Sequence, residues 1–148
     1  LGVRMGAMSD LTILRRLTSQ DVPLKEATPV LESDSAQKLL ELMEKTGASD
    51  FVVTDVGGHY AGMVVSDDFR EALVYRESIP LLQVSELRRC DLPTVSPEET
   101  LDIVLDKFSR SDVQSLVVVD DADQITGLIN RSRLMARYQK ALDADVDQ

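Results

Sequence analysis

The sequence contains two similar stretches, VVTDVGGHYAGMVVSDDF at 52–69 and VVVDDADQITGLINRSRL at 117–134. Each runs from an apolar strand through an aspartate and a polar turn into a second strand that contains a glycine. Short β-branched runs on either side of turn residues predict a β-hairpin. The two stretches differ where the next helix should begin, because the first closes on Ser66-Asp67-Asp68 and the second on Arg131-Ser132-Arg133.

The repeat extends beyond the two hairpins. The segment 28–73 aligns with the segment 93–138 without a gap. The identical positions are Val30/Val95, Leu40/Leu105, Val52/Val117, Val53/Val118, Asp55/Asp120 and Gly62/Gly127. A repeat of this length indicates that one supersecondary unit is used twice.

Each copy predicts the order strand, helix, strand, strand, helix. First strands are expected at 29–31 and 94–95, and the helices that follow should begin at Ser33 and Ser96-Pro97, which suit a cap and a first-turn proline. These helices should end near Gly47 and Asp112. Their apolar faces have the spacing i, i+3, i+4, i+7 and consist of Ala36, Leu39, Leu40 and Met43, and of Leu101, Val104, Leu105 and Phe108.

The remaining strands and helices follow from the hairpins. Strands are predicted at 51–54, 60–65, 116–119 and 125–129, and closing helices at about 67–77 and 132–142. Gly57-Gly58 should form a turn with His59 in solvent, while Met63 and Phe69 should be core residues. The strands are too short and apolar for one copy to cover its sheet alone. The predicted fold class is therefore α+β, with two β-α-β-β-α units related by a pseudo-two-fold and small sheets packed face to face.

The predicted boundaries place a flanking linker or partner helix at 1–16, the first unit at 17–77, the second unit with its lead-in segment at 78–142, and an acidic tail at 143–148. A short lead-in helix should occur twice, since SIPLLQVSEL at 78–87 resembles RRLTSQDVPL at 15–24. The pairs Arg15-Arg16 and Arg88-Arg89 are expected to face solvent or a partner.

Composition excludes several classes of protein. The chain has 148 residues and a formal net charge of −10, so it should repel nucleic acid and anionic lipid. No apolar run approaches the roughly 20 residues of a membrane span. The chain starts at Leu1 rather than at Met, as expected of a piece of a longer protein.

Catalytic and metal chemistry are not expected. The single cysteine, Cys90, has no histidine in its own repeat, and His59 is the only histidine, so a Cys–His nucleophile has little support. The run Asp120-Asp121-Ala122-Asp123 lacks the glycine and distal glutamate of a calcium loop and is expected to be a hairpin turn. We therefore predict no enzyme activity and no metal site.

The duplicated unit resembles a tandem CBS domain pair, also called a Bateman module. The resemblance rests on Gly62-Met63-Val64-Val65-Ser66-Asp67-Asp68-Phe69 and Gly127-Leu128-Ile129-Asn130-Arg131-Ser132-Arg133-Leu134, and on the helix entries at 30–34 and 95–101. It covers about residues 17–142. It implies a regulatory module that forms a homodimer, and two clefts between the units where many CBS pairs bind ATP, ADP or AMP.

By this resemblance, the acid at the start of the closing helix accepts hydrogen bonds from ribose. A hydroxyl residue three positions earlier, helped by the helix N-terminus, meets phosphate. The first cleft would then consist of Asp68, Val65, Ser66, Leu92, Thr94, Val113 and Gln114. Val65 departs from the family pattern, which has Thr or Ser there, and Ser66 comes one place late.

The second cleft would use Thr28, Ala48 and Ser49, with Asn130 at the hydroxyl position and Arg133 at the acid position. An arginine only donates hydrogen bonds, so it cannot accept from ribose. It can instead pair with a phosphate or with an acid of a partner. We expect this cleft not to bind adenosine in the usual pose.

The linker at 75–87 resembles that of CBS pairs in bacterial ClC-type chloride channels and transporters. This implies a cytoplasmic module attached to a transport domain in the inner membrane. Two alternatives remain, a divalent-cation-sensing CBS module of a magnesium transporter and a CBS insert of a metabolic enzyme such as IMP dehydrogenase. CBS pairs of osmolyte transporters are a further source of the same pattern.

Overall fold

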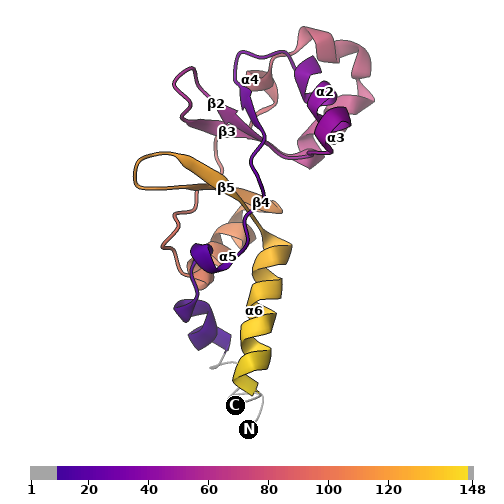
Figure 1. Cartoon of the computed structure of the whole chain (residues 1–148). Helices are drawn as coiled ribbons and strands as arrows, with labels where there is room; N and C mark the ends of the chain where they lie inside the picture. The colour runs from indigo at the N-terminus through magenta and orange to yellow at the C-terminus, as the bar shows by residue number, and fades with distance from the viewer. Residues whose placement is uncertain (1–9, 147–148) are drawn as a thin grey trace. The chain divides into compact units, whose positions relative to one another are not determined.

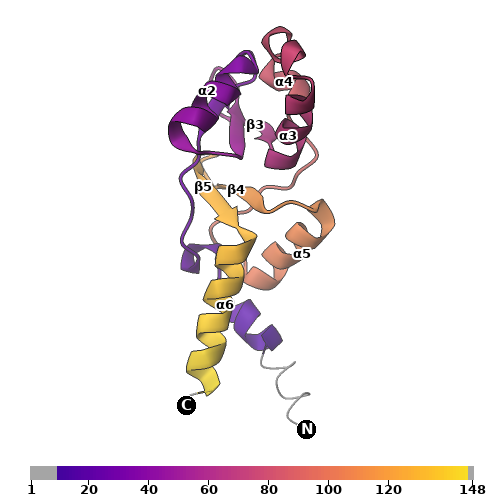
Figure 2. The same ribbon diagram turned by 90° about the vertical axis from the view of Figure 1, so that its right-hand side faces the viewer.

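The structure, a computed structural model, describes residues 10–146 and divides them into two compact units. One unit consists of residues 26–92 together with 122–125. The other consists of residues 10–25, 93–121 and 126–146. Figures 1 and 2 show the elements of each. Residues 1–9 of the predicted linker lie outside the described residues.

The first unit is built on a three-stranded sheet in the order β1-β2-β3. β1 (Pro29–Leu31) pairs in parallel with β2 (Phe51–Thr54), which pairs antiparallel with β3 (Tyr60–Val64). The helices are α2 (Gln37–Thr46) and α3 (Ser66–Val74), followed by the 3-10 helix η2 (Arg76–Leu81) and the short α4 (Val84–Leu87). Its core contains Leu39, Phe51, Phe69, Ile79 and Val84, all at most 2% exposed.

The second unit repeats this order with a smaller sheet. It contains η1 (Ser19–Asp21), α5 (Leu101–Ser111), the hairpin of β4 (Ser115–Val119) with β5 (Ile125–Asn130), and α6 (Arg131–Val146). Residues 10–16 are also helical. The strand predicted at 94–95 is reduced to a single parallel bridge between Val95 and Val118, because Pro97 has no N–H with which to extend it.

The two helices predicted to start at Ser33 and Ser96 begin later, with Ala36 and Thr100 at their N-caps. The delay is due to a turn before each helix. The Leu31 N–H donates to the Asp34 carboxylate at 2.9 Å, and the Ser96 N–H donates to the Glu99 carboxylate at 3.1 Å. The predicted ends are confirmed, since Gly47 and Asp112 terminate α2 and α5 in the left-handed region.

The other predicted elements are confirmed within a few residues, and the α+β class with small sheets is confirmed with them. Met63 and Phe69 are buried, and His59 is exposed. The predicted acidic tail is helical as far as Val146, where α6 ends. The face-to-face packing about a pseudo-two-fold remains a prediction.

The two lead-in segments, residues 10–25 and 78–92, each pack against the opposite repeat rather than their own. Thr18 bridges Thr100 and Lys25 bridges Leu128, so the first lead-in joins the second repeat. Gln83 bridges Ser35 and Arg89 bridges Met63, so the second lead-in joins the first repeat. Each compact unit therefore combines one repeat with the lead-in segment of the other, and the boundaries at 17–77 and 78–142 stay a prediction about the sequence repeats.

The predicted lead-in helix is present in both segments. Thr18 and Gln83, which are equivalent when the alignment of the two repeats is continued backwards, are the N-caps of η1 and α4. Their backbone N–H groups donate to the Asp21 and Glu86 carboxylates at 2.8 and 3.2 Å. The structural repeat thus begins at Thr18 and Gln83, earlier than the alignment from Thr28 indicates.

Candidate functional site

Asp68, the predicted ribose acceptor, lies in the first turn of α3 and is half-buried. Its Oδ2 is 3.9 Å from the Arg89 Nε, and the same Nε is 3.8 Å from the Asp91 carboxylate. Asp68 also lines an open hollow of about 560 Å³ together with Glu71, Tyr75, Glu86 and Arg88. The acid is therefore accessible, beside two cations, Arg88 and Arg89, and three further carboxylates.

The N-terminus of α3 is already capped by a carboxylate. The Ser66 N–H donates to the Asp50 Oδ1 at 2.9 Å, while Val65, the N-cap residue, is extended and buried. A carboxylate at this position is favoured by the helix dipole. It also occupies a place where a phosphate would otherwise bind and repels a second anion. No sequence pattern pointed to Asp50, because the whole β2-β3 hairpin separates it from Ser66.

The other predicted residues of this unit are Leu92, Thr28, Ala48 and Ser49. Leu92 is buried, Ser49 is exposed, and Thr28 and Ala48 are half-buried. The Thr28 carbonyl accepts from the Val52 N–H at 3.0 Å, so this residue continues the pairing with β2 just before β1 begins. The Ala48 N–H donates to the Thr46 hydroxyl at 3.2 Å.

Thr94, Val113 and Gln114 belong to the other unit. The Thr94 carbonyl accepts from the Lys107 ammonium at 2.7 Å, and the Gln114 carbonyl accepts from the Arg131 N–H at 2.9 Å. Val113 is buried, whereas Gln114 is exposed. The backbone carbonyls of Thr94 and Gln114 thus accept hydrogen bonds from residues of α5 and α6.

Asn130 and Arg133 have structural contacts at the start of α6. The Asn130 Oδ1 accepts from the N–H groups of Ser132 and Arg133 at 2.9 and 3.3 Å, so it acts as a helix cap. The Arg133 guanidinium donates to the Pro23 carbonyl at 3.3 Å. Each predicted cleft draws residues from both units, so the two clefts remain predictions, and the structure gives the setting of each half.

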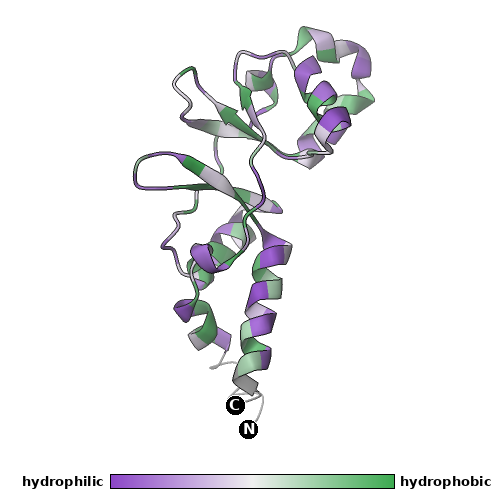
Figure 3. Cartoon of the chain, viewed as in Figure 1, coloured by the Kyte–Doolittle hydropathy of each residue, from purple (hydrophilic) through white to green (hydrophobic). Residues whose placement is uncertain are grey.

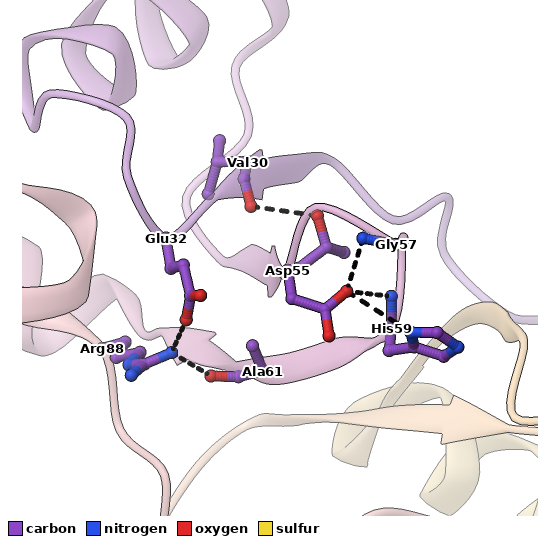
Figure 4. Close-up of polar contacts among 8 residues, drawn as sticks. Val30, Glu32, Asp55, Gly57, His59, Ala61 and Arg88 are labelled. Carbon is purple, nitrogen blue, oxygen red and sulfur yellow. Dashed lines mark hydrogen bonds and ion pairs between the residues drawn. The ribbon is translucent and has the colours of Figure 1, made fainter.

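Arg88 was expected to face solvent or a partner, and this is wrong. Its guanidinium donates to the Glu32 carboxylate and to the Ala61 carbonyl, and its side chain is 25% exposed (Figure 4). Arg88 therefore ties the second lead-in to β3 and to the residue after β1. Figure 4 also shows Asp55 accepting from the N–H groups of Gly57 and His59, which forms the predicted turn.

Within residues 10–146, no group of three or more His, Cys, Asp or Glu side chains is placed to hold a metal ion. No helix in the same part of the chain is long and apolar enough to span a membrane. Tyr60 has an unusual environment, since burial, with the Cys90 and Asp91 charges, raises its pKa to about 12.

The family comparison agrees with the fold and the repeat. The CBS domain family matches the chain twice, at residues 19–75 and 84–140. The chain therefore belongs to the CBS domain family and is a tandem pair. No curated protein matches it in sequence.

Solved structures with this fold include other CBS proteins. A CBS domain-containing protein of unknown function from Bacillus anthracis is 13% identical, with a TM-score of 0.74 over 86% of this chain and 96% of that chain. The CBS domain pair of protein MJ0100, in complex with 5′-methylthioadenosine and S-adenosyl-L-methionine, is 18% identical, with a TM-score of 0.71 over 84% and 98%. The CBS domain of a bacterial CNNM/CorC family Mg²⁺ transporter is 16% identical, with a TM-score of 0.72 over 88% and 80%. At these identities the likeness establishes the fold.

Proposed function

We propose that this CBS pair is the cytoplasmic regulatory module of an ion channel or transporter and that it forms a homodimer. In this proposal an adenosine ligand binds at Asp68 and biases the attached transport domain between two states. The module itself catalyses no reaction. The observation that carries the proposal is an accessible acid in the first turn of the closing helix, at the position where the family resemblance places its ribose acceptor.

The surroundings of Asp68 favour a ligand with little negative charge. Asp50 already occupies the Ser66 N–H at the N-terminus of α3, and Val65 supplies no hydroxyl for a phosphate. An adenosine ligand without phosphates avoids repulsion from Asp50, so S-adenosylmethionine should bind more tightly than ATP. The complex of the MJ0100 pair with two such ligands supports this choice.

Calorimetric titration of the protein with S-adenosylmethionine and ATP tests the proposal. Asp68→Ala should weaken S-adenosylmethionine binding at least about tenfold, the scale of a hydrogen bond to a charged group. Asp67→Ala is the matched control, because Asp67 lies in the same helical turn and its side chain is 84% exposed. Equal losses in the two variants, or no heat with either ligand, would refute the proposed site.

The proposed dimer and transport domain need their own measurements. Light scattering should give twice the mass of the chain, and a strict monomer would contradict the dimer. Hydrophobic spans encoded upstream of Leu1 would support the transporter. A titration that gives heat with Mg²⁺ alone would instead support the cation-sensing alternative, to which the resemblance to the Mg²⁺ transporter domain points.

A further inference from the structure

Three basic side chains surround a groove between the helix of residues 10–16 and the C-terminal part of α6. The groove has a volume of about 360 Å³. Arg16, Arg137 and Lys140 supply its charge, and Ile13, Leu17 and Ala141 supply apolar surface. Figures 1 and 2 show the two helices side by side, and all these residues belong to one compact unit.

The positive charge continues along α6. Arg133, Arg137 and Lys140 are spaced i, i+4, i+7 and so share one face of the helix over about 10 Å. A second hollow of about 430 Å³, lined by Arg133, Arg137 and Lys140, adjoins the first. Figure 3 shows hydrophilic and hydrophobic residues alternating along α6.

No carboxylate described by the structure pairs with the three groove cations. Among the described side chains, those of residues 10–144, Arg16, Arg137 and Lys140 form no ion pair. In the same unit, Arg15, Lys107 and Arg110 pair with Asp102, Glu99 and Asp106. The chain has 26 acids for 16 basic residues, so a shortage of acids does not explain the difference.

Two acids of the same two helices have other partners. Asp143 accepts from the Gln139 amide at 2.9 Å. Asp10 is hydrogen-bonded to the Tyr138 hydroxyl. Among the side chains that the structure describes, the three cations of the groove are thus unpaired, in a protein whose net charge is −10.

We infer that this groove binds the phosphate groups of a soluble small molecule. Arginine and lysine are the side chains that recognise phosphate, and a volume of about 360 Å³ is within the range of small-molecule sites. The apolar surface at Ile13, Leu17 and Ala141 would contact the uncharged part of the ligand. This site shares no residue with the proposed adenosine site at Asp68.

Calorimetric titration with inorganic triphosphate tests this inference. We expect wild-type protein to release or absorb heat that declines as salt is added, since the attraction is between charges. Arg137→Gln and Lys140→Gln should each weaken binding about tenfold, the loss expected for one charge-assisted hydrogen bond. Arg110→Gln is the control, because Arg110 is an exposed cation of the same unit outside the groove.

Four outcomes would overturn the inference. The first is the absence of heat with triphosphate, and the second is an equal loss in Arg110→Gln. The third is loss of triphosphate binding in Asp68→Ala, which would place the phosphates at the Asp68 site and also overturn the preference proposed there for ligands without phosphates. The fourth is binding to lipid in place of triphosphate. In that case the protein would co-sediment with phosphatidylcholine vesicles only when they contain phosphatidic acid, Arg137 would be required, and free triphosphate would not bind. This result would assign the groove to a lipid surface.

Discussion

Asp68 and Arg133 occupy equivalent positions in the two repeats with opposite charges, and each has a matching contact in a lead-in segment. Asp68 lies 3.9 Å from Arg89, whereas Arg133 donates to the Pro23 carbonyl. The positions equivalent to Arg88 and Arg89 in the first lead-in are Pro23 and Leu24, which carry no charge. Each of the two opposite charges therefore has a contact in the lead-in segment beside it. Of the two residues, only Asp68 can accept hydrogen bonds from a ribose.

Tyr60 carries a hydroxyl that is buried and finds no hydrogen-bond partner among the described residues. Its folded-state pKa, about 12, lies above the ordinary value of 10.0. Stability that depends on the neutral phenol is thus fully present below pH 10 and is lost as the pH rises through 12.

We predict that Tyr60→Phe leaves the free energy of unfolding unchanged below pH 10 or raises it by up to about 1 kcal/mol, because an unsatisfied hydroxyl is removed. Between pH 10 and 12 the wild type should lose stability more steeply than the variant. Urea denaturation across this range measures both effects. If the free energy of unfolding fell equally with pH in the wild type and in Tyr60→Phe, the loss of stability would not be due to Tyr60.

At the scale of elements, the glycine shared by β3 and β5 is explained by the lead-in segments. A Cβ at Gly62 would lie 2.7 Å from the Arg89 carbonyl oxygen, and one at Gly127 would lie 2.9 Å from the Lys25 carbonyl oxygen. The lead-in backbone bridges the neighbouring residues Met63 and Leu128 at these places. Close approach of two backbones thus requires glycine in both copies.

Gly62→Ala should destabilise the first unit much more than Gly58→Ala. Both glycines have positive φ, 121° and 83°, but only Gly62 has a backbone atom in the way of a Cβ. We expect a loss of about 1 kcal/mol for Gly58→Ala from strain alone, and roughly 3 kcal/mol or more for Gly62→Ala. Equal losses in urea denaturation would show that the lead-in contact contributes nothing.

At the scale of the whole molecule, the exchange of lead-ins makes one unit contiguous and the other not. Residues 26–92 contain nearly all of the first unit, with only 122–125 outside, whereas the second unit needs residues 10–25 from the far end of the chain. The two repeats should therefore differ in their ability to fold as fragments.

We expect a fragment of residues 26–92 to unfold cooperatively in urea, followed by circular dichroism. A fragment of residues 78–148 should not, because it leaves buried residues such as Leu101 and Leu128 without the lead-in that bridges beside them. A control that joins residues 93–148 to residues 10–25 through a Gly/Ser linker should regain the cooperative transition. Independent folding of 78–148 would contradict the exchange.

Much of this architecture could be predicted from local patterns. β2 was predicted at its observed bounds because a β-branched run is enclosed by turn residues, and α2 and α5 end where Gly47 and Asp112 can adopt positive φ. The lead-in exchange could not be predicted, because an alignment of the two repeats shows that two segments are alike but not against which repeat each packs.

The same limit applies to the candidate site. The family resemblance identified Asp68, but its contact with Arg89 and the contact of Asp50 with Ser66 join residues that are distant in the sequence. Residue patterns do not specify such pairings until the fold is known. The basic groove combines residues from opposite ends of the chain, Arg16 with Arg137 and Lys140.

The exchanged lead-ins also set an order of events during translation. Residues 26–92 leave the ribosome early and can fold while the rest of the chain is still being made, at about 5–20 residues per second. Residues 10–25 emerge before them, but their bridge partners Thr100 and Leu128 are synthesised only afterwards. This segment thus finds its place later than the 26–92 segment that follows it, and its apolar residues, such as Ile13 and Val22, stay exposed in the interval although they are buried in the folded unit.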